Sequence, residues 1–300
     1  MISIYINKQN FFKTLVKNLL TIFSNYPKSN LGPTNVFINL AEGLRSNGIK
    51  FNVNPSKDKV YNICLVLSGI DNLKKCIILK KNKKIKILLA GPNVVTVPSE
   101  HSYIIFSRSI DRILVPSEWV KKLYLTYKKE CKNISIWFSG IKISNFKSGK
   151  KNKVLIYLKN KNSFFEKCIN YLNTNNVDFR ILKYGFFSQK TYFELLRQSR
   201  IMIYFSSSES QGIAMQEAWS ENVPTLVYKQ SFWFYGKRKF KASSSPYLNK
   251  YCGLFFKNFN EFIIRFNKLN NNTKLKPKNW LNKKMSQYAS IKNLLDIIKE

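Results

Sequence analysis

Short runs of aliphatic and aromatic residues recur along the chain and alternate with longer segments in which apolar residues return at helical spacing. This alternation is typical of β-α-β units, whose parallel strands form a sheet covered by helices. We therefore expect an α/β protein with two Rossmann-like, doubly wound domains. The predicted strands cover residues 2–6, 62–67, 85–90 and 112–115 in the first half and residues 153–158, 179–184, 201–205 and 224–227 in the second half.

The length of the chain supports the same division. Its 300 residues fit two domains of about 150 residues each. Segment 147–153 is polar, basic and contains glycine, and it separates the two sets of strands, so we interpret it as an interdomain linker. We expect an N-terminal domain over residues 1–147 and a C-terminal domain over residues 153–280. Apolar residues at helical spacing predict a last helix over residues 281–300.

Two carboxylates stand eight positions apart after the strand that ends near residue 205. Serines that favour turns precede Glu209, and a helix is predicted from near Gln211 to before Pro224, so Glu217 lies one to two turns into it. Ligands of open α/β sheets bind at this carboxyl edge, where helix N–H groups around Gly212 and Ile213 would favour a diphosphate. Carboxylates there can accept hydrogen bonds from sugar hydroxyls. The alternative is a structural pair, with Glu209 capping the helix and Glu217 solvated.

The pattern Glu-x-x-Gly-x-x-x-x-Glu-Ala-x-x-x-x-x-Pro-Thr over residues 209–225 resembles the E-x7-E signature of retaining nucleotide-sugar glycosyltransferases with the GT-B fold, of the glycosyltransferase family 4 or group 1 type. The resemblance implies two domains that face a cleft and a C-terminal helix that crosses back to the first domain. It also implies that Glu209 contacts the donor sugar as a catalytic residue, that Glu217 binds the ribose hydroxyls, and that the reaction needs neither a metal nor another cofactor.

The same resemblance assigns further donor contacts in the second half. Lys159 and Lys161 follow the first strand of that half, where the family places a basic pair on the donor diphosphate. Gly185 lies in the loop that the family places against the nucleotide base. Ser244 lies where hydroxyls could hold phosphate oxygens. Solvated surface lysines and a plain serine-rich loop are the alternatives.

In the first half, the resemblance points to an acceptor side. Gly32 opens a predicted helix at the position of a glycine-containing loop near the acceptor, and Asn93 follows the strand predicted over residues 85–90, in the loop that leads to His101. His101 is the only histidine in the chain, and acid/base catalysis or an acceptor contact is one hypothesis for it. The other is a surface or structural histidine, because the leaving phosphate can itself take the proton of the acceptor.

The charge balance raises the question of a polyanionic partner. The net charge is +35, from 43 lysines and 8 arginines against 16 acidic residues. Arginine is the residue favoured for bidentate recognition of bases and phosphates, and no nucleic-acid-binding motif occurs, so we do not expect nucleic acid as a partner. Basic clusters beside the aromatic residues 232–235 and beside Trp280 would suit an anionic membrane surface.

No apolar run is long enough to span a bilayer. Residues 11–23 make a poor signal peptide, because lysines interrupt them and no cleavage site follows. Five widely spaced cysteines are typical of reduced core residues in a cytoplasmic protein and show no metal-binding spacing. The sequence therefore predicts a cytoplasmic glycosyltransferase, peripheral on the inner membrane face, that transfers a sugar to a glycan, lipid-linked or polysaccharide acceptor with retention and without a metal. The alternative is a non-catalytic basic binding protein, either a nucleic-acid binder or a degenerate transferase-like module.

Overall fold

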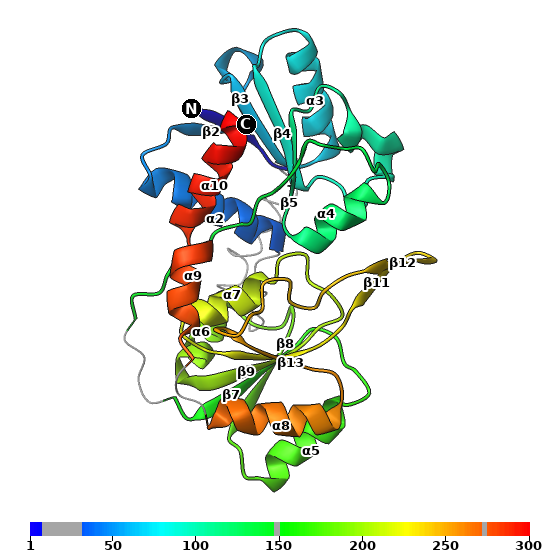
Figure 1. Cartoon of the computed structure of the whole chain (residues 1–300). Coiled ribbons are helices and arrows are strands. Elements are labelled where there is room, and N and C mark those ends of the chain that lie inside the picture. Colours follow the sequence, from blue (N-terminus) through cyan, green and yellow to red (C-terminus); the bar gives the residue numbers. More distant parts are fainter. Residues whose placement is uncertain (8–31, 147–150, 272–274) are drawn as a thin grey trace. The chain divides into compact units, whose positions relative to one another are not determined.

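The computed structural model describes residues 1–7, 32–146, 151–271 and 275–300 (Figure 1). They form two compact units. Unit 1 holds the described residues of Met1–Val16, Leu31–Gly140 and Gln287–Glu300, and unit 2 holds those of Ile141–Ser286. The change of unit thus falls at Gly140, before the predicted linker, of which residues 147–150 lie outside the described ranges.

Unit 1 is built on a six-stranded parallel sheet with the order β2-β1-β3-β4-β5-β6. Its central strands are buried, as in β3, where four successive residues are apolar and inaccessible to solvent. Such continuous apolar runs are typical of parallel strands that are covered on both faces. The strands are β1 (Ile2–Tyr5), β2 (Phe51–Val53), β3 (Ile63–Ser68), β4 (Ile87–Asn93), β5 (Arg112–Val115) and β6 (Ile134–Ile136), and the helices are α2 (Gly32–Ser46), α3 (Ile70–Lys81), α4 (Glu118–Leu125) and α10 (Gln287–Lys299), with 3-10 turns η1 (Lys57–Lys59) and η2 (Glu100–Phe106).

Unit 2 contains a five-stranded parallel sheet with the order β13-β10-β9-β7-β8 and a separate two-stranded antiparallel hairpin, β11-β12. The strands of the sheet are β7 (Lys153–Leu158), β8 (Phe179–Lys183), β9 (Ser199–Phe205), β10 (Thr225–Tyr228) and β13 (Gly253–Phe256), and those of the hairpin are β11 (Phe232–Tyr235) and β12 (Arg238–Lys241). The helices are α5 (Phe165–Thr174), α6 (Gln189–Gln198), α7 (Ile213–Ser220), α8 (Phe259–Asn270) and α9 (Pro277–Met285).

The two faces of the unit 2 sheet carry different side chains because successive strand residues point to opposite sides. Val154 and Ile156 of β7 belong to an apolar core that α5 and α8 cover, and phenylalanines such as Phe256 and Phe262 dominate it. The opposite face, toward α6 and α7, carries tyrosines and is described below. Figure 1 shows α5 and α8 together on one side of the sheet.

The C-terminal segment differs from the single crossover helix predicted over residues 281–300. It forms two helices, α9 in unit 2 and α10 in unit 1, because Ser286 has an extended backbone with φ −64° and ψ 165°. A β-bridge between Ser286 and Ile141 and a hydrogen bond of 2.9 Å from the Ile141 N–H to the Met285 carbonyl hold this break. Within unit 1, α10 packs on α2, where Ile291 lies against Gly43.

The predicted fold class is confirmed, since both units are parallel α/β layers with the doubly wound strand order of Rossmann-like domains. Trp280 is only partly exposed, because its ring packs edge-on against the buried Trp219 at a centroid distance of 5.8 Å, and its part in a membrane surface stays a prediction. All five cysteines are free thiols, and four of them are buried. Over the described ranges, the helices are too short or too polar to cross a bilayer.

Candidate functional site

The carboxyl edge of the unit 2 sheet has a topological switch point between β7 and β9. From β7 the chain first adds β8 on one side, and then it adds β9, β10 and β13 on the other side. Loops at such a point leave in opposite directions and open a crevice for ligands. β7 and β9 are paired up to Leu158 and Phe205. Lys159, the first residue after β7, donates its backbone N–H to the Phe205 carbonyl at 2.9 Å.

Glu209 lies at this switch point with a carboxylate that is fixed by several donors. Its Oε1 accepts hydrogen bonds from the Lys159 ammonium at 2.9 Å, the Tyr204 hydroxyl at 2.8 Å and the Ser206 hydroxyl at 2.9 Å. Its backbone N–H donates to the Ser243 carbonyl at 2.8 Å. The side chain is 12% exposed, so the carboxylate is almost enclosed but still reachable from solvent. Three side chains thus hold the Glu209 carboxylate as a hydrogen-bond acceptor at the sheet edge.

Glu217 lies in α7 and is buried rather than solvated. Its Oε1 accepts a hydrogen bond of 2.7 Å from the amide of Gln189, the first residue of α6. Burial raises the pKa of Glu217 to about 8, and the hydrogen bond from Gln189 lowers the pKa only in part. A carboxyl group with such a pKa binds or releases a proton near neutral pH, which is typical of functional sites rather than of surface glutamates.

A layer of buried tyrosines underlies both glutamates. Tyr157 of β7 stacks on Tyr204 of β9 at a centroid distance of 4.9 Å and meets Tyr192 of α6 edge-on at 5.6 Å. Tyr192 donates a hydrogen bond of 2.6 Å to the Ala214 carbonyl in the first turn of α7. Burial, and secondarily the nearby Glu209, hold the pKa of Tyr204 well above its ordinary value. The hydroxyl therefore stays protonated and donates a hydrogen bond to the Glu209 carboxylate.

Gly212 connects the two glutamates at the start of α7. Its backbone is left-handed, with φ +83° and ψ 48°. A Cβ atom at this position would lie 2.7 Å from the Cε of Met215 and 3.7 Å from the Cβ of Glu209. The backbone conformation therefore favours glycine here, and a larger residue would also require the flexible end of Met215 to move. The N–H groups of Ile213 and Ala214, the first two residues of the helix, have no preceding turn to bond to and lie at the same edge, as an anion site requires.

The structure separates the other predicted donor residues. Lys159 reaches Glu209, whereas Lys161 is exposed and forms its ion pair with Glu166. Gly185, with φ +85°, lies in the loop after β8, the strand next to β7, and a Cβ there would meet open space. The hydroxyl of Ser244 is fully buried and serves the backbone, because it donates to the Tyr228 carbonyl at 2.7 Å and accepts from the Gln230 N–H at 3.2 Å.

The predicted acceptor-side residues belong to unit 1. Gly32 is the first residue of α2, and the space around its Cα is open. Asn93 ends β4, and its buried Nδ2 has no hydrogen-bond partner among the described residues. His101 is exposed in η2, where it starts a run of three residues in the left-handed region, with φ of 50°, 56° and 60°. A left-handed backbone is uncommon for residues other than glycine, so three in succession make η2 a strained turn.

The donors around the two glutamates were not foreseen. A carboxylate accepts a hydrogen bond from each of Tyr204, Ser206 and Gln189. Of these three, the sequence pattern could have pointed to Tyr204. Tyr204 is the one hydroxyl-bearing residue in the apolar run 201–205 that leads to Glu209, and a buried tyrosine hydroxyl requires a partner. Within the described residues, no group of three or more histidine, cysteine or acidic side chains is suited to a metal ion.

Neither a protein-family model nor a curated protein sequence matches this chain. Solved structures do match it in fold. The apo form of the lipopolysaccharide outer core galactosyltransferase WaaB superposes with a TM-score of 0.60 at 12% identity over 99% of both chains. Anabaena HepE, solved with UDP, gives a TM-score of 0.63 at 9% identity over 99% of both chains.

TarM, which is also known from S. aureus as a complex with UDP and a glycan, matches less completely. The TM-score of TarM is 0.57 at 16% identity, over 88% of this chain and 58% of TarM. At these identities the likeness concerns the fold. It shows that the two α/β units have the architecture of GT-B glycosyltransferases.

Proposed function

We propose that the protein is a glycosyltransferase that takes a sugar from a nucleotide-sugar donor bound at the carboxyl edge of the unit 2 sheet. The observation that carries this proposal is the meeting of Lys159 and Glu209, at 2.9 Å, across the switch point between β7 and β9. The pair supplies an acceptor for sugar hydroxyls and a cation for a diphosphate at one point. The solved structures that share the fold include HepE complexes with UDP and with UDP-glucose, which supports a uridine nucleotide as the first donor to test.

Glu209 contacts the hydroxyls of the donor sugar in this proposal. Three donors already hold its Oε1, so the carboxylate cannot rotate freely and is preorganised for the transition state. Its negative charge stabilises the positive charge that develops on the anomeric carbon as the glycosidic bond weakens. The Lys159 ammonium has three N–H donors, and those not directed at Glu209 bind oxygen atoms of the diphosphate.

Glu217 binds the ribose hydroxyls of the nucleotide. Because its pKa is about 8, it is largely protonated at neutral pH before a nucleotide binds. Two ribose hydroxyls that donate to it favour the ionised form, so nucleotide binding releases a proton. Gln189 holds the carboxyl group in place from the start of α6.

In the reaction, the bond between the anomeric carbon and the diphosphate oxygen breaks, and a bond to an acceptor hydroxyl oxygen forms. The acceptor proton goes to the leaving diphosphate, which keeps the bonding electron pair. With attack on the face that the diphosphate leaves, the anomeric configuration is retained, and Lys159 supplies the charge neutralisation that a metal ion provides elsewhere. His101 has no required part in this scheme. The acceptor we propose is a glycan, lipid-linked or polysaccharide hydroxyl.

The test combines binding and transfer. Thermal unfolding is measured with UDP-, GDP- and ADP-sugars, because a ligand that binds only the folded state stabilises it by about 2.7 kcal/mol at a hundredfold excess over its Kd. Transfer or slow hydrolysis of the stabilising donor is then followed for the parent protein and for Glu209→Gln. We expect the variant to keep its fold and to lose transfer by at least about a hundredfold.

Two results would contradict the proposal. Full transfer by Glu209→Gln would remove the carboxylate from the mechanism. Absence of stabilisation by every nucleotide sugar, together with stabilisation by oligonucleotides, would favour a basic binding protein in which the glutamates are structural. Glu194→Gln, an exposed change on α6 in the same unit, is the matched control and should behave as the parent protein does.

A further inference from the structure

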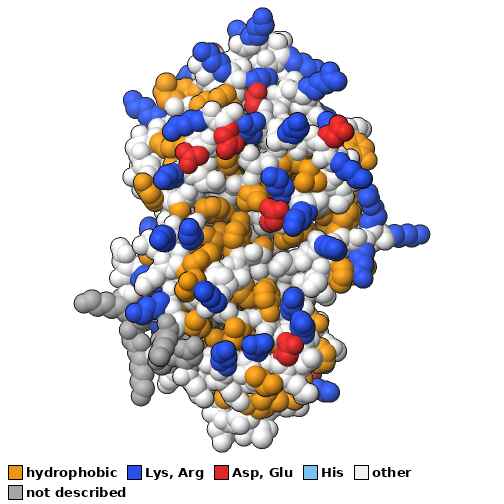
Figure 2. Space-filling model, in the orientation of Figure 1, with side chains coloured by type: hydrophobic (Ala, Val, Ile, Leu, Met, Phe, Trp, Pro, Cys, Tyr) orange, Lys and Arg blue, Asp and Glu red, His pale blue; other side chains and the backbone are white. Residues whose placement is uncertain are grey.

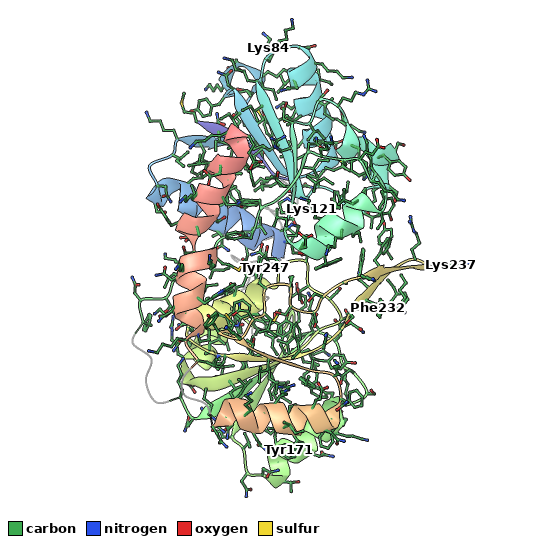
Figure 3. All side chains as sticks on the ribbon, in the orientation of Figure 1. Lys84, Lys121, Tyr171, Phe232, Lys237 and Tyr247 are labelled. Carbon is green, nitrogen blue, oxygen red and sulfur yellow. The ribbon has the colours of Figure 1, made fainter. Side chains whose placement is uncertain are left out.

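The β11-β12 hairpin is built unlike the rest of unit 2. All four residues of β11, Phe232–Tyr235, are aromatic, and three of the four residues of β12, Arg238–Lys241, are cationic. Figure 1 shows the two strands extending away from the five-stranded sheet, and in Figure 3 Lys237 marks the outer end and Phe232 lies nearer the base. The pairing forms a two-stranded sheet of its own.

Two phenylalanines of this hairpin expose apolar surface to water, which is unfavourable. Phe234 is 62% exposed and Phe232 is 39% exposed, and the two point to the same face because they are two positions apart in one strand. A two-stranded ribbon has little stability in water by itself, so exposed phenylalanines on it indicate a partner surface. The residues directly opposite them on β12 are Lys239 and Lys241.

The charges around the hairpin select the kind of partner. Residues 222–260 contain seven lysines and arginines and no aspartate or glutamate. An anionic surface is the complement of such a segment. Figure 2 shows lysine and arginine side chains spread over the visible face with few acidic ones, so a second copy of the chain would be repelled. An anionic lipid bilayer offers both negative headgroups and an apolar layer just beneath them.

Nucleic acid is the competing polyanion, and the ring geometry disfavours it. Base stacking requires an open ring face. The Lys239 ammonium lies over the ring of Phe232 at 4.0 Å from its centroid and is 5.9 Å from the centroid of Phe234. A cation over one ring and a neighbouring exposed phenylalanine suit the boundary between headgroups and acyl chains instead, where aromatic residues and lysines accumulate together.

We propose that the β11-β12 hairpin is a membrane-anchoring element that inserts its phenylalanines into the interfacial layer of an anionic bilayer while its lysines and Arg238 bind the headgroups. The outer edges of a two-stranded sheet carry unpaired backbone N–H and C=O groups, which cannot enter the hydrocarbon layer. Insertion therefore stops at the headgroup level, and the anchor is reversible and sensitive to salt. The element acts independently of the reaction at Glu209.

The test uses the whole protein with vesicles of phosphatidylcholine alone and of phosphatidylcholine mixed with phosphatidylglycerol. Two double variants separate insertion from adsorption: Phe232→Ser with Phe234→Ser, and Lys237→Glu with Lys241→Glu. Their matched controls are Ile264→Ser, which changes a 65% exposed residue of α8, and Lys268→Glu with Lys283→Glu, which makes the same charge change on exposed helix positions. All of these residues belong to unit 2, and thermal unfolding checks the fold of each variant.

We expect the parent protein to sediment with the anionic vesicles, and each hairpin variant to bind them at least about tenfold more weakly than its control. Acyl chains brominated near the headgroup should quench the fluorescence of Trp233 in the hairpin, and Trp233→Phe should remove that component. Equal binding by the serine variant and the parent would show adsorption by net charge alone and would overturn the proposal. Loss of single-stranded DNA binding in the serine variant, with unchanged vesicle binding, would overturn it in favour of nucleic acid.

Discussion

The Lys159 ammonium and the Glu209 carboxylate lie 2.9 Å apart although 50 residues separate them in the chain. They meet because β7 and β9, which are not consecutive, are neighbours in the sheet. The carboxyl ends of parallel strands share one edge, so the residue after each strand faces the same crevice. The contact between Lys159 and Glu209 therefore depends on the strand order of unit 2.

Lys159→Met should remove both the partner of Glu209 and the proposed diphosphate contact. We expect the transfer rate to fall at least about a hundredfold, and the free energy of unfolding to fall by about 1–2 kcal/mol because a nearly buried carboxylate loses an ionic partner. Urea titration and a transfer assay measure the two effects. Lys161→Met is the control, because Lys161 pairs with Glu166 at an exposed position, where ion pairs contribute about 0–1 kcal/mol. An equal loss of transfer in both variants would contradict the distinct role of Lys159.

Tyr204→Phe should disturb the position of Glu209 without removing its charge. The change deletes the 2.8 Å donor, and we expect a loss of about 1–2 kcal/mol in stability and roughly a tenfold fall in kcat, with KM for the donor little changed. Tyr192→Phe deletes a hydrogen bond of similar burial, to the Ala214 carbonyl, and should lower stability but not kcat. If both variants lowered kcat alike, the effect would belong to packing of the tyrosine layer and not to Glu209.

Glu217 should make stability depend on pH in a direction opposite to that of an ordinary ion-paired glutamate. Its pKa is about 8 in the folded protein and near 4.5 when unfolded, so the folded state holds the extra proton between these values. Its contribution is complete below about pH 4.5 and falls by up to about 1.4 kcal/mol per pH unit until about pH 8. Relative to the parent protein, Glu217→Gln should therefore gain stability as pH rises from 5 to about 8, as measured by urea unfolding.

The same proton gives a second readout of Glu217. If ribose hydroxyls donate to its carboxylate, UDP should bind more tightly as pH rises toward about 8, and calorimetry in buffers of different ionisation enthalpy should detect proton release. In Glu217→Gln both effects should disappear. A pH-independent Kd for UDP in the parent protein would contradict the ribose contact while leaving the stability prediction intact.

Gly212→Ala and Gly185→Ala form a matched pair. Both glycines have a left-handed backbone, with φ of +83° and +85°, so each substitution costs about 1–2 kcal/mol in backbone strain. Only Gly212 also has a neighbour in the way, the Met215 Cε at 2.7 Å. We expect Gly212→Ala to unfold at a lower temperature than Gly185→Ala and to bind UDP more weakly, and equal melting temperatures would show that Met215 yields without cost.

Much of the fold could be predicted from the sequence because parallel strands buried on both faces appear as unbroken apolar runs. β5 and β7 have the predicted bounds, and the other six predicted strands differ by one to three residues at an end. β2 and β6 were missed because they are edge strands of three residues, too short to give a pattern. The break at Ser286 was missed because apolar spacing continues across it, whereas the contacts with Ile141 that hold the break come from a distant part of the chain.

The residues of the candidate site that lie close together in the sequence could be predicted. The contacts that depend on which strands and helices are neighbours could not. Glu209, Gly212 and Glu217 lie within one strand-loop-helix segment, so their spacing carries the information. The partners of the carboxylates depend on which strands and helices are neighbours: Gln189 approaches Glu217 from α6, and Lys159 approaches Glu209 from β7. No local pattern specifies those contacts. The buried hydroxyl of Ser244 could not be distinguished from an available one for the same reason.

The packing of α10 on α2 has a consequence for biosynthesis. The helix that completes unit 1 is made after all of unit 2, and Ser290 in it accepts a hydrogen bond of 3.3 Å from the indole of Trp137 through its carbonyl. While the ribosome is still translating residues before 287, α2 lacks the helix that packs on it. The described residues of unit 2 all lie between Ile141 and Ser286, so this unit can fold as it emerges. The unit whose synthesis begins first is therefore the last to be finished.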